Sequence, residues 1–190
     1  MATRAIAMSD SVTAKLKELA ARARGTVQVG FIDSDQAPIA FYNEFGHGGR
    51  FPAPARPFFR TMVASESGKW PGMIEEELKR TKFNGKRTMK FMGEEIEGAL
   101  QKSIINTNSP GLSPTTLRLR YKFWGNPQDI RMRDVLQAQK DVEKALVTDV
   151  LREMTTGKKG RRFGIASGTH AKPLIWTKDM LNATTYKVTD

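Results

Sequence analysis

Three prolines within six residues, Pro52, Pro54 and Pro57, place the strongest constraint on how this chain can fold. Each proline fixes its own φ, lacks an amide donor and pushes the preceding residue toward extended geometry. The segment therefore cannot continue a helix or lie in the middle of a sheet. It follows a glycine-containing stretch, residues 46–49, and precedes Phe58. The sequence predicts a stiff, extended strap between two helices.

The segments before this strap have periodic apolar patterns. Apolar residues at helical spacing predict a helix over about 10–24, and alternating β-branched residues predict a strand over 26–32. A short helix over 37–45 is expected to end at Gly46 in the left-handed conformation. The side chains expected to face inward are Val12, Leu16, Leu19 and Ala23 in the first helix, Val27, Val29 and Phe31 in the strand, and Ile39, Ala40 and Tyr42 in the second helix.

The segments after the strap are predicted to be mainly helical. Helices are expected over about 58–63, 70–82, 87–105, 129–154 and 178–182, short strands over 174–176 and 184–188, and loops over 106–114 and 157–169. The apolar stripes are Met89, Met92, Ile96, Ala99, Leu100 and Ile104 in one long helix, and Val135, Val142, Ala145, Leu146, Val150 and Leu151 in the other. The pattern indicates an α+β fold, in which a small antiparallel sheet is packed by several helices and one long helix is inserted.

Composition limits the classes of function that are open to the chain. A length of 190 residues suits one domain, and the absence of cysteine excludes disulfides, thiolate metal sites and cysteine nucleophiles. No secretion signal or apolar run of membrane-spanning length is visible, so a protein without membrane contact, made and used in a cytoplasm, is expected. The net charge of +11 predicts a polyanionic or acidic partner.

The basic residues are clustered in two stretches. The first cluster has no acidic residue within it and the second lies in the glycine-rich loop. Both are hypothesised to face nucleic acid, although a solvated helix or loop face explains such runs in a chain of ordinary charge. The first cluster consists of Lys79, Arg80, Lys82, Lys86, Arg87 and Lys90, and the second consists of Lys158, Lys159, Arg161 and Arg162.

Catalytic and cofactor motifs are weak. The glycines at 46–49 do not follow a strand and do not lead into Lys-Ser/Thr, so a phosphate-binding loop is not expected. Glu44 and His47 are spaced for a shared metal ion, but His170 has no suitably spaced partner. No serine occupies a nucleophile elbow. We therefore expect no enzyme, cofactor or metal, and rank a metal-dependent hydrolase around these three residues last.

Two separated signatures resemble one protein family. The first is a strand, a helix ending in Tyr42-Asn-Glu-Phe-Gly46, a glycine loop and Pro54-Ala-Arg-Pro-Phe-Phe-Arg60. The second combines Ser113-Pro-Thr-Thr-Leu117 with Lys172-Pro-Leu-Ile-Trp-Thr-Lys-Asp-Met-Leu-Asn-Ala183. In this order they are similar to the neck and tail-completion proteins of tailed bacteriophages. The family's Thr-Gly is replaced by Thr177-Lys178, and residues of about 120–170 look like an insertion.

The resemblance implies a structural protein of the virion neck that joins the tail to the head. It implies a ring around the DNA channel, sixfold by analogy with tail tubes, with the head–tail connector and a tail terminator or tube protein as neighbours and non-specific contact with packaged DNA. Synthesis would take place in the cytoplasm of the bacterial host. The expected structural motif is Glu44, Phe45, Gly46, Pro54, Arg56, Pro57 and Phe58, and the expected assembly loop is His47, Gly48, Gly49, Arg50 and Phe51.

Arg56 lies between two prolines and is expected to make a bidentate pair with Glu44, which would clamp the two sides of the loop. Phe58 is expected to anchor the following helix in the core. The same motif could be core architecture alone, in which case function would lie in the loop and the basic faces. A second hypothesis is a non-specific DNA-binding protein, a monomer or dimer, that acts through the two basic clusters.

Overall fold

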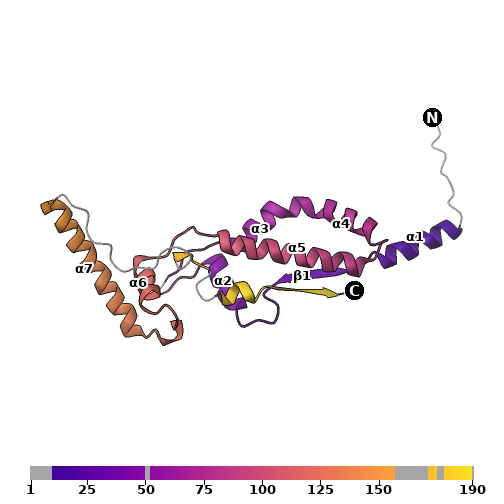
Figure 1. Cartoon of the computed structure of the whole chain (residues 1–190). Coiled ribbons are helices and arrows are strands. Elements are labelled where there is room, and N and C mark those ends of the chain that lie inside the picture. The colour runs from indigo at the N-terminus through magenta and orange to yellow at the C-terminus, as the bar shows by residue number, and fades with distance from the viewer. Residues whose placement is uncertain (1–9, 50–51, 157–170, 175–177, 190) are drawn as a thin grey trace. The chain divides into compact units, whose positions relative to one another are not determined.

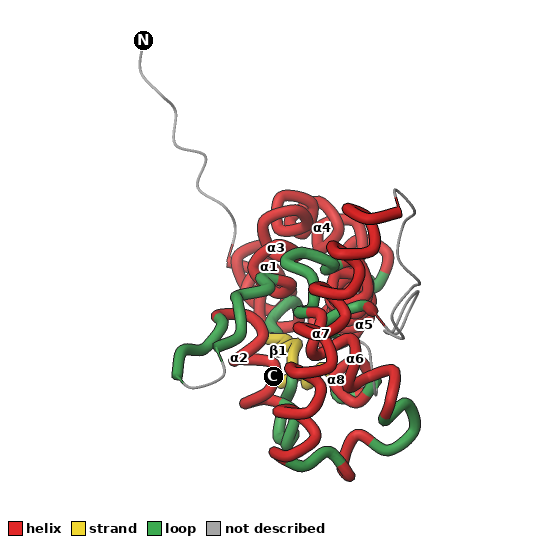
Figure 2. The backbone as a smooth tube through the Cα atoms, turned by 90° about the vertical axis from the view of Figure 1, so that its left-hand side faces the viewer, coloured by secondary structure: helices red, strands yellow, loops and turns green. Residues whose placement is uncertain are grey.

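The computed structural model describes residues 10–49, 52–156, 171–174 and 178–189, and side chains within residues 149–156 are excepted. The chain divides into two compact units: unit 1 comprises Met1–Ile104 with Met180–Asp190, and unit 2 comprises Ile105–Asp179. The insertion expected at about 120–170 lies within unit 2. The α+β class is confirmed, because a two-stranded antiparallel sheet is packed by helices (Figures 1 and 2).

The sheet of unit 1 joins two distant parts of the sequence. Strand β1, Thr26–Gly30, pairs antiparallel with β2, Thr185–Thr189, and Val29 lies opposite Tyr186. Both strands begin close to their predicted starts, Thr26 and Thr184, but β1 stops before Ile32. Gly30 ends it with a φ of 153°, which favours glycine.

Helix α5, Gly85–Asn106, packs against this sheet (Figure 1). A side chain at Gly93 would overlap the ring of Tyr186, so the glycine lets the strand approach the helix closely. The Tyr186 hydroxyl donates to Glu94 Oε1 at 3.1 Å, and Gln101 Nε2 donates to Thr184 Oγ1 at 2.9 Å. The predicted stripe of α5 is confirmed at its most buried positions, Met92, Leu100 and Ile104.

Three helical segments lead from the strap to α5. They are α3, Phe58–Glu66, the short 3-10 helix η1, Ser67–Lys69, and α4, Trp70–Arg80. Phe58 and Met62 on α3 are buried, and Phe58 meets Phe31 edge-on with ring centroids 6.1 Å apart. The role expected for Phe58 as a core anchor therefore agrees with its burial.

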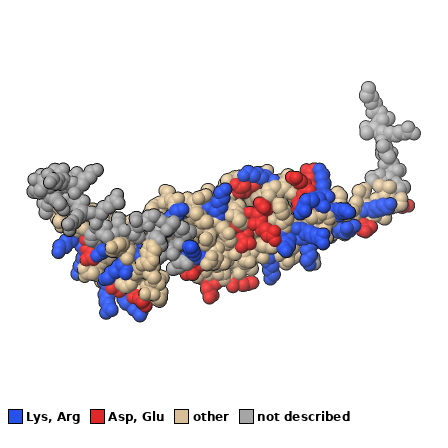
Figure 3. Space-filling view, in the orientation of Figure 1, with Lys and Arg blue, Asp and Glu red and all other residues tan. Residues whose placement is uncertain are grey.

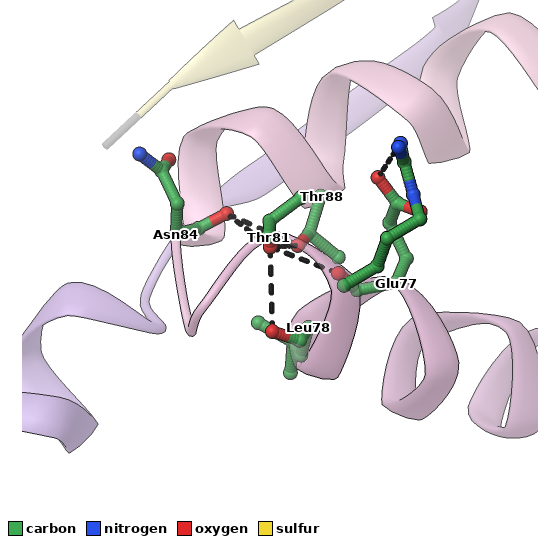
Figure 4. Close-up of polar contacts among 6 residues, drawn as sticks. Glu77, Leu78, Thr81, Asn84 and Thr88 are labelled. Atoms are coloured by element: carbon green, nitrogen blue, oxygen red, sulfur yellow. Dashed lines mark hydrogen bonds and ion pairs between the residues drawn. The ribbon is translucent and has the colours of Figure 1, made fainter.

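A compact turn connects α4 to α5 (Figure 4). Thr81 Oγ1 donates to the Glu77 carbonyl oxygen at 2.8 Å and lies 3.1 Å from the hydroxyl of the fully buried Thr88. Thr88 in turn donates to the carbonyl oxygen of Asn84 at 3.0 Å, and Asn84 Oδ1 caps α5 by accepting the Arg87 amide at 3.0 Å. This network fixes the segment that carries the first basic cluster.

The two N-terminal helices bury less than their patterns predict. Helix α1, Asp10–Arg22, has no buried residue, and Leu16 is 50% exposed. Helix α2, Ala37–Phe45, has the predicted bounds and buries Ala40, but Ile39 is 47% exposed and Tyr42 is also exposed. The inward orientation expected for Val12, Leu16, Ile39 and Tyr42 was wrong, because these side chains are exposed, whereas Leu19 and Ala23 are half-buried.

Unit 2 is built around a helix pair. Helix α6, Pro114–Lys122, was not predicted; Ser113 caps it by accepting the Thr116 amide at 3.2 Å. It packs on α7, Met132–Thr156, which follows the 3-10 helix η2, Pro127–Asp129.

The interface between α6 and α7 combines apolar packing with one ion pair. Leu119, Ala138 and Val142 are buried there, and Arg118 Nη2 lies 3.4 Å from Asp141 Oδ2. The apolar face predicted for α7 is covered only in part, since Leu146 is 59% exposed. Its side chains beyond residue 148 lie outside the described residues.

The C-terminal segment of unit 2 is tied to α6 by Arg120. This buried guanidinium donates to the Lys172 carbonyl oxygen at 2.6 Å and to that of Pro173 at 2.9 Å. Leu174 lies in a turn, and the remainder of the strand predicted over 174–176 falls outside the described residues. Helix α8, Asp179–Asn182, follows within the predicted range 178–182. Among the described residues, no helix is long and apolar enough to cross a membrane.

Candidate functional site

The strap, residues 52–57, closes a loop at the end of α2. His47 and Ala53 form an isolated antiparallel bridge, in which each amide donates to the other residue's carbonyl oxygen at 3.0 Å. Gly46 begins this loop with a φ of 73° and a ψ of 172°, which is not the left-handed helical conformation that was expected. A Cβ at Gly46 would lie 2.7 Å from the Ala55 amide nitrogen, so the strap crosses too closely for any other residue.

Glu44 on α2 holds the first turn of α3 across this loop. Glu44 Oε2 accepts the Phe59 amide at 2.8 Å, and Oε1 accepts the Arg60 amide at 3.1 Å and Arg60 Nε at 2.8 Å. The N-cap residue of α3 is Pro57, whose side chain has no oxygen for capping. Because the first amides of a helix have no partner within it, the buried Glu44 carboxylate acts as a cap supplied from a different helix.

The ion pair expected between Glu44 and Arg56 is replaced by one with Arg60. Glu44 and Arg60 are also joined by a hydrogen bond of 3.2 Å from Arg60 Nη2 to the Glu44 carbonyl oxygen. Arg56 is buried, its amide donates to the Asn43 carbonyl oxygen at 2.7 Å, and burial lowers the pKa of its guanidinium. The expected clamp is therefore present, but residues on α3, not Arg56, close it.

Helix α2 presents an exposed aromatic face that sequence analysis missed. It consists of Phe41, Tyr42 and Phe45, and the rings of Phe41 and Phe45 have centroids 4.8 Å apart. The Arg60 guanidinium lies 4.8 Å from the centre of the Phe45 ring, so it is held both by this ring and by Glu44. The signal was in the sequence: APIAFYNEF is apolar around most of the helix, although only Ala40 and Glu44 are buried.

Beside this face lies an apolar groove of about 360 Å³ between β1, α2 and α3. Exposed aromatic side chains next to such a hollow are typical of a surface that binds another protein. The apolar lining of the groove includes Val29, Phe31, Ala40, Phe41, Phe45 and Phe58.

The expected assembly loop is described only in part. His47, Gly48 and Gly49 are exposed, whereas Arg50 and Phe51 lie outside the described residues. The His47 ring meets that of Tyr42 edge-on, with centroids 5.6 Å apart, so the loop continues the aromatic face of α2.

The first basic cluster lies on the α4–α5 turn, and its members differ in their partners. Lys79 Nζ lies 2.6 Å from Glu75 Oε1, Arg80 makes two hydrogen bonds of 2.6 Å to the Glu77 carboxylate, and Lys90 Nζ lies 3.9 Å from Glu94 Oε1. In the described part of the chain, no carboxylate pairs with Lys82 or Arg87. Lys82 and Phe83 have φ angles of 54° and 61°, which places the two residues on a sharp, exposed corner.

Two arginines that sequence analysis did not single out extend this basic surface. A side chain at Gly85 would overlap the backbone of Ala23 and Arg24, so the end of α1 crosses directly over the start of α5. The crossing forms a hollow of about 340 Å³ lined by Arg22, Arg24 and Lys86, together with Asn84 and Ala21. Figure 3 shows Lys and Arg side chains gathered over this end of unit 1.

The remaining residues named in the sequence analysis are described only in part. Glu44, proposed in the hydrolase alternative, uses both carboxylate oxygens to hold α3, and His170 lies outside the described residues. Within the described ranges, no group of three or more acidic or histidine side chains is placed to bind a metal ion. The second basic cluster, residues 158–162, also falls outside the described part of the chain.

Comparisons with protein-family profiles, curated proteins and solved structures found no match to this chain.

Proposed function

We propose that this protein is a structural component of a tailed-bacteriophage virion, a tail-completion or neck protein that joins the tail to the head as part of a ring around the DNA channel. The observation that supports the proposal most strongly is the arrangement of α2, the strap and α3. The two described parts of the phage-like signature, Tyr42–Gly46 and Pro54–Arg60, form this arrangement, in which Glu44 Oε2 accepts the Phe59 amide of α3 at 2.8 Å.

The distribution of apolar surface supports an assembling subunit. Helix α1 buries none of its residues, and α2 exposes Phe41 at 58% together with two further aromatic side chains. A subunit of a closed ring needs two unlike surfaces, one for each neighbour. The basic surface at the α4–α5 turn supplies positive charge suited to a DNA channel.

The proposal is tested by electron microscopy of a phage lysate that lacks this protein. Separate filled heads and finished tails are expected, and adding purified protein is expected to join them and restore infectivity. A Gly46→Val variant serves as the matched control, because the valine side chain leaves no room for the strap crossing and this variant should not join heads to tails. Intact, infectious particles in the lysate without the protein would contradict the proposal.

The second candidate function is non-specific binding of DNA by a monomer or dimer. The observation that favours it is the hollow lined by Arg22, Arg24 and Lys86. Lys82 in the α4–α5 turn and Arg87 in the first turn of α5 are close to Lys86 in the sequence. Cations placed in this way neutralise phosphates without reading the base sequence. Light scattering separates the two functions, because a stable large ring favours the neck protein. A monomer or dimer that binds duplex DNA with a steep dependence on salt concentration favours the DNA-binding protein.

A further inference from the structure

Helix α1 has an apolar stripe that the described residues of its own chain leave largely exposed. Val12, Leu16 and Leu19 recur at helical spacing, yet none of the residues of α1 is buried. A helix of 13 residues is only marginally stable by itself in water, so its stability depends on packing of the apolar stripe. The stripe therefore needs a partner surface outside the described residues of its own chain.

The groove beside α2 is the matching hollow. It is lined by apolar side chains, including Val29, Phe31 and Phe41, and its volume is about 360 Å³. Three apolar side chains from successive turns of a helix fill a groove of this kind in the helix-in-groove mode of recognition. Both surfaces belong to unit 1.

A single chain cannot bring the two surfaces together. Within unit 1, α1 and α2 lie at opposite ends, with the length of α5 between them (Figure 1). The crossing of Gly85 under Arg24 fixes the end of α1 on the start of α5, away from the groove. A stripe at one end and a groove at the other can meet only when they belong to different molecules.

Arg60, which also lines the groove, is paired with Glu44, so the charges left to steer docking are those of α1 and of the turn before α2. Lys15 and Lys17 flank Leu16 on α1, while Asp33 and Asp35 lie in the exposed turn that leads from β1 to α2 at the groove. Opposite charges of this kind favour one docking orientation and speed association.

We propose that α1 of one copy of this chain docks in the groove between β1, α2 and α3 of a second copy. The contact is heterologous, so repeating it produces a ring if the rotation closes and a filament if it does not. The inference rests on the proposed function, because that function requires a ring. The stripe of α1 and the groove are the two surfaces that would form each contact in the ring.

Cross-linking tests this contact directly, because the chain has no cysteine of its own. A Leu16→Cys variant is mixed with a Phe41→Cys variant and treated with a short bis-maleimide. We expect a product of twice the 21.2 kDa monomer mass that contains one copy of each variant. Ala14→Cys, on the opposite side of α1, is the matched control and should cross-link far less with Phe41→Cys.

Sedimentation of the uncross-linked protein provides a second measurement. Wild type is expected to self-associate with increasing concentration, and Leu16→Glu is expected to weaken this by about tenfold or more, because burial of a charged side chain opposes docking. Since α1 has no buried residue, circular dichroism should show that Leu16→Glu leaves the rest of the fold intact.

Three results would overturn the inference. They are sedimentation of wild type as a monomer at every concentration, equal cross-linking from Ala14→Cys and Leu16→Cys, or cross-linking within one chain in a Leu16→Cys/Phe41→Cys double variant. Failure of cross-linking while the protein still joins heads to tails overturns only this inference. Efficient cross-linking by a protein that joins no heads to tails supports the contact and overturns the proposed function.

Discussion

Glu44 and Arg60 are joined three times: Glu44 Oε1 accepts both the Arg60 amide and Arg60 Nε, and the Glu44 carbonyl oxygen accepts Arg60 Nη2. These contacts cross the strap, so α2 and α3 are held in one orientation despite the loop between them. The exposed aromatic face of α2 and the groove beside it depend on that orientation.

Replacing Glu44 by Gln is expected to reduce the free energy of unfolding by about 1–2 kcal/mol, since the amide can accept only at one atom and carries no charge. Urea denaturation measures this change. Glu75→Gln is the control, because Glu75 pairs with Lys79 on an exposed helix surface and should change stability less. Equal effects of the two substitutions would contradict the capping role of Glu44.

Gly93 and Gly98 form a matched pair on α5. A side chain at Gly93 would overlap the Tyr186 ring, whereas nothing lies within 4 Å of a Cβ at Gly98. Gly93→Ala is expected to lower stability by about 1–3 kcal/mol through overpacking, and Gly98→Ala to raise it by about 0.5–1 kcal/mol through helix propensity. Thermal unfolding of the two variants measures the direction of each change in stability relative to wild type. Stabilisation by Gly93→Ala would contradict the close packing of β2 on α5.

Glu77 is expected to make stability depend on pH in the acid range. Hydrogen bonds from Arg80 hold the pKa of the Glu77 carboxyl below its ordinary value of 4.5. A carboxyl group whose pKa is lower in the folded state than in the unfolded state stabilises the fold when the pH is above its unfolded-state pKa. This stabilisation is lost as the pH falls through the folded-state pKa. The difference in unfolding free energy between wild type and Glu77→Gln should therefore shrink below about pH 4.5. A difference that is constant with pH would contradict this.

The basic surface is expected to bind duplex DNA through Lys82 and Arg87. Lys82→Asn removes charge but retains a residue that tolerates the left-handed conformation, and Arg87→Gln removes the second charge. The logarithm of the DNA-binding constant falls linearly with the logarithm of the salt concentration, and each lost phosphate contact should make this slope shallower by about 0.9. Fluorescence anisotropy of a labelled duplex measures the slope. Lys79→Gln is the control, since Lys79 is paired with Glu75, and an equal effect of this variant would contradict the assignment.

Local signals in the sequence determined most of the helix boundaries. Pro38 at the first turn and Gly46 after the last turn delimit α2, and the apolar stripe of α5 predicted its buried positions. These features follow from backbone geometry and from the spacing of neighbouring residues, which a sequence contains directly. Helix α6 was missed although Ser113-Pro114 is a helix-start signal, because the turn-rich composition before it was given more weight.

Only the tertiary structure decided which distant groups meet. The sequence analysis paired Glu44 with Arg56, but the direction in which α3 leaves the strap brings Arg60 to Glu44 instead. The pairing of Val29 with Tyr186, the crossing of Gly85 under Arg24 and the exposure of the α2 aromatic face likewise depend on contacts between residues far apart in the chain. Periodicity shows that a helix has an apolar side, but only packing decides whether the same molecule covers it.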